Sequence, residues 1–213
     1  MRRVYPACED AGRVNPRHMD GQAARFLLIV RERVRLGSED AYDDNERQIA
    51  AACTALKCPH AYLALTTVTE PTDVWWLNAF ASVEERHSVE ASYAGNGPLM
   101  AAIAPLAARK HTFRESIAST MTEFRRDLSA SALRVAGTRF VAVTTGFEGQ
   151  AAVGSVYQAP DGSRFTFAVA QQADAAYDLG ARMGTSARIL RVRPEWSFPD
   201  QDWIAADPGF WMP

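Results

Sequence analysis

The order of strand and helix signals is the feature of this sequence that most constrains its fold. Two strand pairs, each joined by a turn signal and followed by a helix signal, predict a duplicated β-β-α pattern. The expected strands are 25–36, 62–69, 73–80, 138–148, 153–158, 164–170 and 187–193, and the expected helices are about 38–57, 82–94, 99–110 and 170–184. The first half, β-α-β-β-α, is the start of a ferredoxin-like unit, which needs one more strand. The second half, β-β-β-α-β, is such a unit with its first helix lost or replaced. We therefore expect an α+β protein whose two ferredoxin-like halves form one barrel-type core.

Three further segments complete the predicted organisation. Residues 1–22 carry Gly, Pro and charge without periodicity, so they predict a flexible leader. Residues 111–136 predict a helical connector between a first half, 23–110, and a second half with its tail, 137–213. The irregular tail carries five large aromatic residues, Trp196, Phe198, Trp203, Phe210 and Trp211. Because such side chains are poorly placed in water, we expect them to pack across the body of the domain.

Composition excludes several classes of function. The 213 residues have a formal net charge of −2, which gives no electrostatic footprint for nucleic acid. No apolar run approaches the roughly 18 residues of a membrane span, and the N-terminus lacks the apolar centre of a signal peptide. A cytoplasmic location is therefore expected. Cys53 and Cys58 do not have a zinc spacing, the histidines are scattered, and Cys53 is expected to be a buried free cysteine. The sequence thus predicts neither a metal nor a cofactor.

The strand DVWWLNAF, residues 73–80, carries the main candidate site residues. Side chains alternate between the two faces of a strand, so Trp75 lies opposite Trp76 and Asn78. One interpretation is that Asn78 is a buried structural amide bonded to the backbone. The other is that Asn78 binds a ligand oxygen in a pocket lined by aromatic residues. The second interpretation places Trp76 and Asn78 on the face towards the sheet's own helices.

Alternating arginines form a second candidate feature. Arg31, Arg33 and Arg35 share one face of the first strand, and Arg191 and Arg193 repeat this spacing in the last strand. Exposed arginines commonly form surface ion pairs. The alternative is an anion-binding patch for a carboxylate or phenolate.

Residues 24 to about 110 resemble the dimeric α+β barrel superfamily, and most closely its antibiotic-biosynthesis-monooxygenase-like group. Three pieces carry the resemblance: RFLLIVRERVRLGSEDAYDDNERQIAAA, LALTTVTEPTDVWWLNAFAS and VEERHSVEASYAGNGPLMAAIAPL. The resemblance implies two ferredoxin-like sheets joined into a barrel, either between chains or within a duplicated chain. It also implies a pocket between each sheet and its helices.

The resemblance further implies a function and candidate site residues of the types Asn, Trp, His and Tyr, to which the alternation of the strands adds Phe80 and the arginines. The expected function is that of a cofactor-independent monooxygenase acting on an aromatic or polyketide-like substrate. The alternative is a non-catalytic ligand-binding or stress-related protein with the same cavity. The candidate catalytic residues are Asn78, Trp76 and His87, and the candidate substrate-binding residues are Phe80, Tyr93, Arg31 and Arg33. The expected partner is a small molecule, and the expected assembly is a monomer with an internal pseudo-dimer or a homodimer.

Overall fold

The computed structural model describes residues 24–69, 72–146, 148–184 and 186–211, so the predicted leader 1–22 lies outside it. The strands are β1 (Phe26–Val34), β2 (Leu63–Thr67), β3 (Asp73–Phe80), β4 (Arg114–Phe124), β5 (Phe140–Thr145), β6 (Ser155–Gln158), β7 (Arg164–Ala170) and β8 (Arg188–Val192). The helices are α1 (Glu39–Leu56), α2 (Val83–Gly95), α3 (Gly97–Arg109), α4 (Ala173–Met183), α5 (Gln201–Ala206) and α6 (Pro208–Trp211), with 3₁₀ turns η1 (Lys110–Thr112) and η2 (Arg126–Leu128).

The eight strands form a closed barrel in the order β1-β3-β2-β8-β5-β7-β6-β4. Every pairing is antiparallel. Within this order, β4-β1-β3-β2 is followed by β8-β5-β7-β6. In each of these two halves the strands lie in the order fourth, first, third, second. Each is the sheet of a ferredoxin-like unit. The prediction of two such halves forming one barrel-type core is therefore confirmed.

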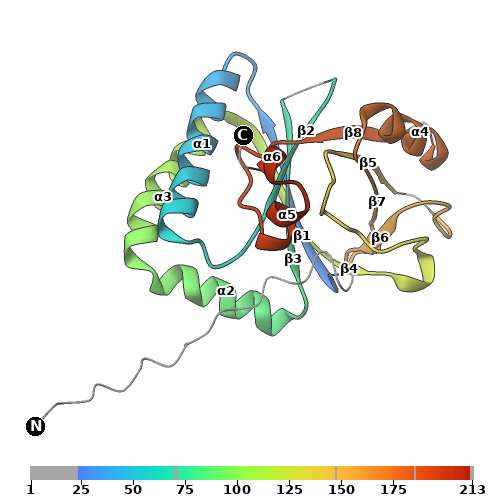
Figure 1. Cartoon of the computed structure of the whole chain (residues 1–213), viewed down its shortest axis with the longest axis horizontal. Helices are drawn as coiled ribbons and strands as arrows, with labels where there is room; N and C mark the ends of the chain where they lie inside the picture. Colours follow the sequence, from blue (N-terminus) through green and yellow to red (C-terminus); the bar gives the residue numbers. More distant parts are fainter. Residues whose placement is uncertain (1–23, 70–71, 147, 185, 212–213) are drawn as a thin grey trace, which may run out of the picture.

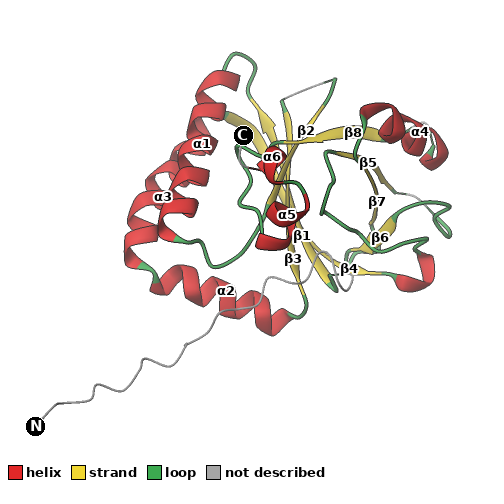
Figure 2. Cartoon of the chain, viewed as in Figure 1, coloured by secondary structure: helices red, strands yellow, loops and turns green. Residues whose placement is uncertain are grey.

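Two seams join the halves within the single chain. At one seam β2 pairs with β8 through Leu65 to Thr67. At the other, β4 pairs with β6 only at Glu123 and Phe124. Helices α1, α2 and α3 lie on the outer side of the first sheet, and α4 lies on the outer side of the second (Figures 1 and 2). No helix lies between β5 and β6 among the described residues there, which agrees with the predicted loss of the first helix.

The predicted helical connector 111–136 is wrong, because residues 114–124 form β4 along the whole length of β1. This strand is the one that the first half needed to complete its unit. All five residues from Glu115 to Ser119 are exposed, so the strand lacks the alternation of buried and exposed positions that marks a half-buried strand. Pairing with β1, rather than an apolar face, holds it in place.

The barrel interior and the C-terminal tail form one hydrophobic core. Inward-facing residues of both halves, among them Leu27, Trp75 and Phe167, pack with Trp203 and Trp211 of the tail. The tail is not irregular as predicted, since it forms α5 and α6, which lie across one end of the barrel (Figure 1). Its aromatic residues pack against the domain, as the sequence predicted.

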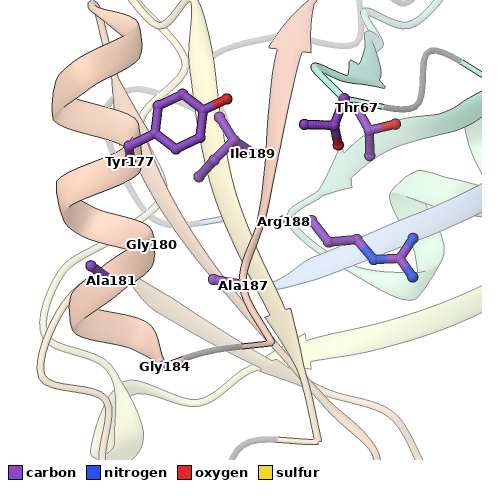
Figure 3. A pocket seen from close by; sticks show the side chains of 9 residues that line it. Thr67, Tyr177, Gly180, Ala181, Gly184, Ala187, Arg188 and Ile189 are labelled. Carbon is purple, nitrogen blue, oxygen red and sulfur yellow. The ribbon is translucent and has the colours of Figure 1, made fainter.

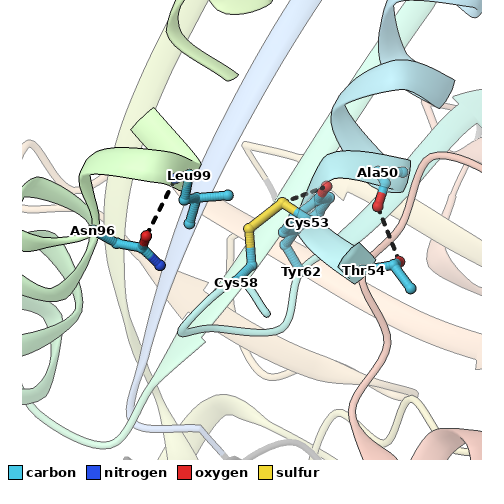
Figure 4. The surroundings of a disulfide bond; sticks show 7 residues. All are labelled: Ala50, Cys53, Thr54, Cys58, Tyr62, Asn96 and Leu99. Carbon is cyan, nitrogen blue, oxygen red and sulfur yellow. Dashed lines mark hydrogen bonds between the residues drawn. A yellow bond between two sulfur atoms is a disulfide. The ribbon is translucent and has the colours of Figure 1, made fainter. Parts of the chain in front are cut away.

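A disulfide joins Cys53 and Cys58 at the end of α1 (Figure 4). Lys57 ends the helix in the left-handed conformation, with φ of 55°, so the chain turns back and the Cys58 N–H donates to the Cys53 carbonyl at 2.9 Å. The expectation that Cys53 is a free cysteine is therefore wrong. Disulfides are uncommon in the cytosol, so this bond does not support the expected cytoplasmic location, which stays a prediction. Among the described helices, none combines the length and apolar character needed to cross a lipid bilayer.

Candidate functional site

The two faces of β3 meet different surroundings. Trp75 points into the barrel and belongs to its central core. Trp76 points the other way, towards α1, and packs with Tyr42 and Trp196. Asn78 shares the helix side with Trp76 because it lies two positions further along the strand, and it is half-buried. The structure thus places Trp76 and Asn78 on the side of the sheet that faces its own helices.

A buried cluster of charged side chains lies against Trp76. Lys110, in the turn that follows α3, places its Nζ 3.0 Å from Glu32 Oε2 and 3.1 Å from Glu46 Oε1. The same ammonium lies 4.6 Å from the centre of the Trp76 ring. Arg114 binds the second oxygen of Glu32 at 2.5 Å. One ammonium therefore links a carboxylate of the sheet, a carboxylate of α1 and an aromatic face, which is a favourable place for a cation.

Tyr42 completes this cluster. Its hydroxyl donates a hydrogen bond to Glu32, and its ring lies 5.3 Å from Lys110 Nζ. Both carboxylates are almost fully buried, whereas the Lys110 side chain is 12% exposed. The cluster consequently has one side that approaches solvent, at Lys110 and Arg114.

The two carboxylates have pKa values displaced in opposite directions. Burial alone would raise the pKa of Glu32, but the charge of Lys110 and the Tyr42 hydrogen bond outweigh it and hold that pKa below its usual value. Burial dominates at Glu46, and its pKa is raised even though Lys110 opposes the change. Burial and the two nearby carboxylates also raise the pKa of Tyr42. Carboxyl pairs with separated pKa values can divide acid and base roles between them.

Trp76 is closely surrounded and only 8% exposed. The Tyr62 ring meets it edge-on at 5.9 Å, and the Trp196 ring stacks at 6.4 Å. Trp196 is itself fixed by a 2.9 Å hydrogen bond from its Nε1 to Asp43 on α1. These contacts fill the space on one side of Trp76.

The remaining candidate residues of the first half do not gather around Trp76. Phe80 shares its face of β3 but stacks on His60, with ring centres 4.6 Å apart. His87 is exposed on α2. Tyr93 packs against the disulfide and Leu99, and burial raises its pKa to about 12. Of the predicted site residues on β3 and α2, only Trp76 therefore contacts the charged cluster; Asn78 shares its face of the sheet but lies on the far side of Trp76 from Glu32.

Arg31 and Arg33 lie on the opposite side of the sheet from Asn78. The Arg31 guanidinium sits inside the barrel, 5.3 Å from the Trp75 ring and 5.5 Å from the Phe165 ring. Arg33 binds Asp73 at 2.7 Å near the end of the barrel. A ligand held by Asn78 therefore meets neither arginine. Lys110 and Arg114 share its side of the sheet but bind Glu32, which lies beyond Trp76.

Sequence reasoning missed Glu32, Glu46 and Lys110. One signal was present, because Glu32 is an acidic residue on a strand face otherwise made of apolar residues such as Val30 and Val34. A carboxylate in that position predicts a buried cationic partner. The identity of that partner was not accessible, since Arg114 is 82 positions away and lies on a strand that was predicted to be helical.

Comparisons with known proteins bear on the fold. No family model and no curated protein matches the chain. A "putative monooxygenase" from Fusobacterium nucleatum has a similar structure, with a TM-score of 0.52 and 9% identity over 83% of this chain and 94% of that one. A "putative monooxygenase" from Lactobacillus acidophilus aligns with a TM-score of 0.47 and 9% identity over 80% and 93%. An anthrone oxidase-like protein aligns with a TM-score of 0.48 and 10% identity over 84% and 95%.

The likeness to the Fusobacterium nucleatum protein agrees with the strand order of the barrel. The chain therefore has the dimeric α+β barrel fold, with both ferredoxin-like halves in one chain. Identities of this size show the fold alone. Within the described ranges, no group of three or more His, Cys, Asp and Glu side chains is arranged to hold a metal ion.

Proposed function

We propose that this protein binds a small aromatic molecule on the Trp76 and Asn78 face and oxygenates it without a cofactor. The observation that carries the proposal is the position of Lys110, between two buried carboxylates and 4.6 Å from the Trp76 ring. A phenolic or enolic substrate placed beside Trp76 would meet an amide, a cation and a carboxyl group with a raised pKa. The monooxygenase descriptions of proteins with the same fold support the proposal.

The chemistry follows from the charges in this cluster. Glu46 is the stronger base of the two carboxylates because its pKa is raised, so it takes the proton of the substrate hydroxyl. Lys110 then balances the charge of the resulting anion. Dioxygen is the oxidant: it takes the electrons of the activated carbon, one oxygen atom becomes a new carbonyl group, and the other leaves as water with the two hydrogens lost from the substrate.

Non-catalytic ligand binding is the second candidate function. The close packing of Tyr62 and Trp196 around Trp76 favours it, because the ring is only 8% exposed. In that case the charged cluster would orient a bound hydroxyl group without removing its proton.

Oxidation of anthrone separates these two functions. Dioxygen uptake and anthraquinone absorbance are measured with the unchanged protein, with Glu46→Gln, and with His87→Gln as a control on an exposed residue. Loss of a general base lowers turnover by about 10²-fold or more, so Glu46→Gln should do so while His87→Gln should not. Equal turnover in Glu46→Gln would contradict the oxygenase proposal. Anthrone binding without turnover in the unchanged protein would favour the binding function.

A further inference from the structure

The end of the barrel where β1 and β5 finish lies opposite the C-terminal tail. Asp207 of the tail binds Arg139, directly before β5, at 2.8 Å, so the tail covers the end where β5 begins. All pairings are antiparallel, and β1 and β5 are four places apart in the barrel order, so both strands run in the same direction. Arg31 and Arg33 share the inner face of β1 with the core residue Ile29, and they therefore lie towards the end that the tail does not cover.

The Arg31 guanidinium is a cation without an anionic partner in the part of the chain that the structure describes. It lies 5.3 Å from the centre of the Trp75 ring and 5.5 Å from that of the Phe165 ring, and it forms no hydrogen bond or ion pair with any described residue. Both rings are almost fully buried, so they shield part of the guanidinium from water. The rings stabilise the positive charge, but the N–H donors at the guanidinium edge are left without oxygen acceptors from the described chain.

A carboxylate at this end of the barrel, Asp73, is already shared by two other arginines. Arg33 donates a hydrogen bond to one of its oxygens at 2.7 Å, and Arg188 of β8 binds the other oxygen. Figure 3 shows the Arg188 side chain directed away from Ile189 and helix α4, which places it on the inner side of the sheet. Both oxygens of Asp73 are therefore engaged with guanidinium groups other than that of Arg31.

Solvent reaches this inner surface beside β4. Ala118 lies directly opposite Arg31 in the pairing of β1 and β4, and Ser116 lies opposite Arg33. Side chains of directly opposite residues share a face of the sheet, so Ala118 and Ser116 belong to the inner surface. Both are exposed, because only the last two residues of β4 pair with β6. Since Arg31 is itself only half-buried, the open stretch of β4 gives an anion a route to its guanidinium.

We propose that this end of the barrel is a binding site for a small monocarboxylate. The carboxylate would bind the N–H edge of Arg31, a planar fork that suits two parallel hydrogen bonds. A ligand with one negative charge is favoured over one with two, because the Asp73 carboxylate repels additional negative charge. The ligand must be short, since Ile29 and Leu65, deeper in the core, are completely buried. The site stands independently of the proposed oxygenase function, because the sheet separates Arg31 from Trp76.

Titration with butyrate, followed by NMR spectroscopy of the indole N–H groups, tests the charge requirement. The Trp75 resonance, assigned with Trp75→Phe, reports on the ring beside Arg31. Butyrate should shift this resonance saturably. Two other probes should bind at least about ten-fold more weakly: n-butanol, which has the same chain without the charge, and inorganic phosphate, which carries more charge.

Replacing the cation tests the role of Arg31 directly. Arg31→Met should raise the butyrate dissociation constant about ten-fold or more, as expected for lost hydrogen bonds to a charged group. Arg191→Met is the matched control, because Arg191 is an exposed arginine on the outer face of β8. It should change the dissociation constant by less than about two-fold, within the scatter of surface substitutions.

A second pair of variants tests the access route and does not depend on Arg31. Ala118→Phe places a ring over the inner surface, whereas Ser119→Phe places the same ring on the opposite face of β4. Ala118→Phe should abolish the butyrate-dependent shift and Ser119→Phe should leave it unchanged, with thermal unfolding confirming that both variants fold. The proposal is overturned if butyrate does not saturate the unchanged protein or if n-butanol or phosphate binds as tightly. It is also overturned if Arg31→Met or Ala118→Phe weakens binding no more than its control.

Discussion

Replacing Lys110 by methionine tests whether the charged cluster behind Trp76 has the energetics that its geometry implies. Lys110 bridges Glu32 and Glu46 at 3.0 and 3.1 Å, and both carboxylates are nearly inaccessible to water. Removing one partner from a buried pair costs about 3–5 kcal/mol, because a charge is left without compensation. Glu32 keeps Arg114 and the Tyr42 hydroxyl. Glu46 is therefore the carboxylate left without a cationic partner, and we expect a decrease of about 3 kcal/mol in the free energy of unfolding at pH 8.

The size of this loss should depend on pH in a defined direction. The pKa of Glu46 is already raised in the folded protein, and removing Lys110 removes the charge that opposes this. A raised carboxyl pKa means that the folded state binds a proton more readily than the unfolded state. The uncompensated charge is therefore present above the folded pKa and disappears as the pH falls towards the unfolded value of 4.5. At pH 5 the loss should shrink to roughly 1 kcal/mol.

Urea denaturation followed by tryptophan fluorescence at pH 8 and pH 5 measures both quantities. Lys57→Met is the natural control, since Lys57 is the other lysine of the chain and is exposed. In a Glu46→Gln background, Lys110→Met should cost at most about 1 kcal/mol, because no buried carboxylate is stranded. Three results would refute the reasoning. They are a loss below about 1 kcal/mol at pH 8, the same loss at both pH values, and the same loss in the Glu46→Gln background as in the unchanged protein.

Three further outcomes are expected. Asn78→Ala should change the free energy of unfolding by less than about 0.5 kcal/mol in urea denaturation, because the half-buried amide has no hydrogen-bond partner among the described residues; a loss of more than about 1 kcal/mol would restore the structural interpretation of this amide. Trp203→Ala should cost about 3–5 kcal/mol, because its fully buried ring closes the barrel core, and a change below about 1 kcal/mol would show that the tail is dispensable. Reducing the Cys53–Cys58 disulfide should cost roughly 2 kcal/mol for so short a loop, and a Cys58→Ser variant should then be insensitive to dithiothreitol; identical unfolding midpoints with and without the reductant in the unchanged protein would contradict this.

Alternation along the strands was sufficient to predict most of the barrel and the two faces of β3. Trp75 and Trp76 are separated in any strand, and the apolar character of both faces matches a sheet covered on both sides. β4 was missed because its exposed positions from Glu115 to Ser119 carry mostly small or polar residues. Its strand state comes from pairing with β1, which is a tertiary effect that a local pattern does not carry.

The charged cluster was less accessible to prediction than the fold. Glu32, Glu46 and Lys110 come from a strand, a helix and a turn, and only the packing of α1 and α3 on the sheet brings them together. The disulfide had the same difficulty on a smaller scale, because it depends on the left-handed conformation of Lys57. Residues without a periodic spacing can be assigned to one site only when the fold of the chain between them is known.

The two halves of the barrel have diverged in how their helices meet the sheet. In the second half the helix-side positions hold small residues, such as Ala142 and Ala168, and α4 presents Gly180 to them. A Cβ on Gly180 would lie 3.9 Å from the Ala142 Cβ, so helix and sheet are in direct contact there. In the first half the corresponding side of the sheet holds Glu32 and Trp76, whose bulk and charge require longer side chains from the helices and turns to meet them. The second half is thus closed by direct contact of helix and sheet, whereas the first half holds buried charges, which destabilise the fold unless each keeps its partner.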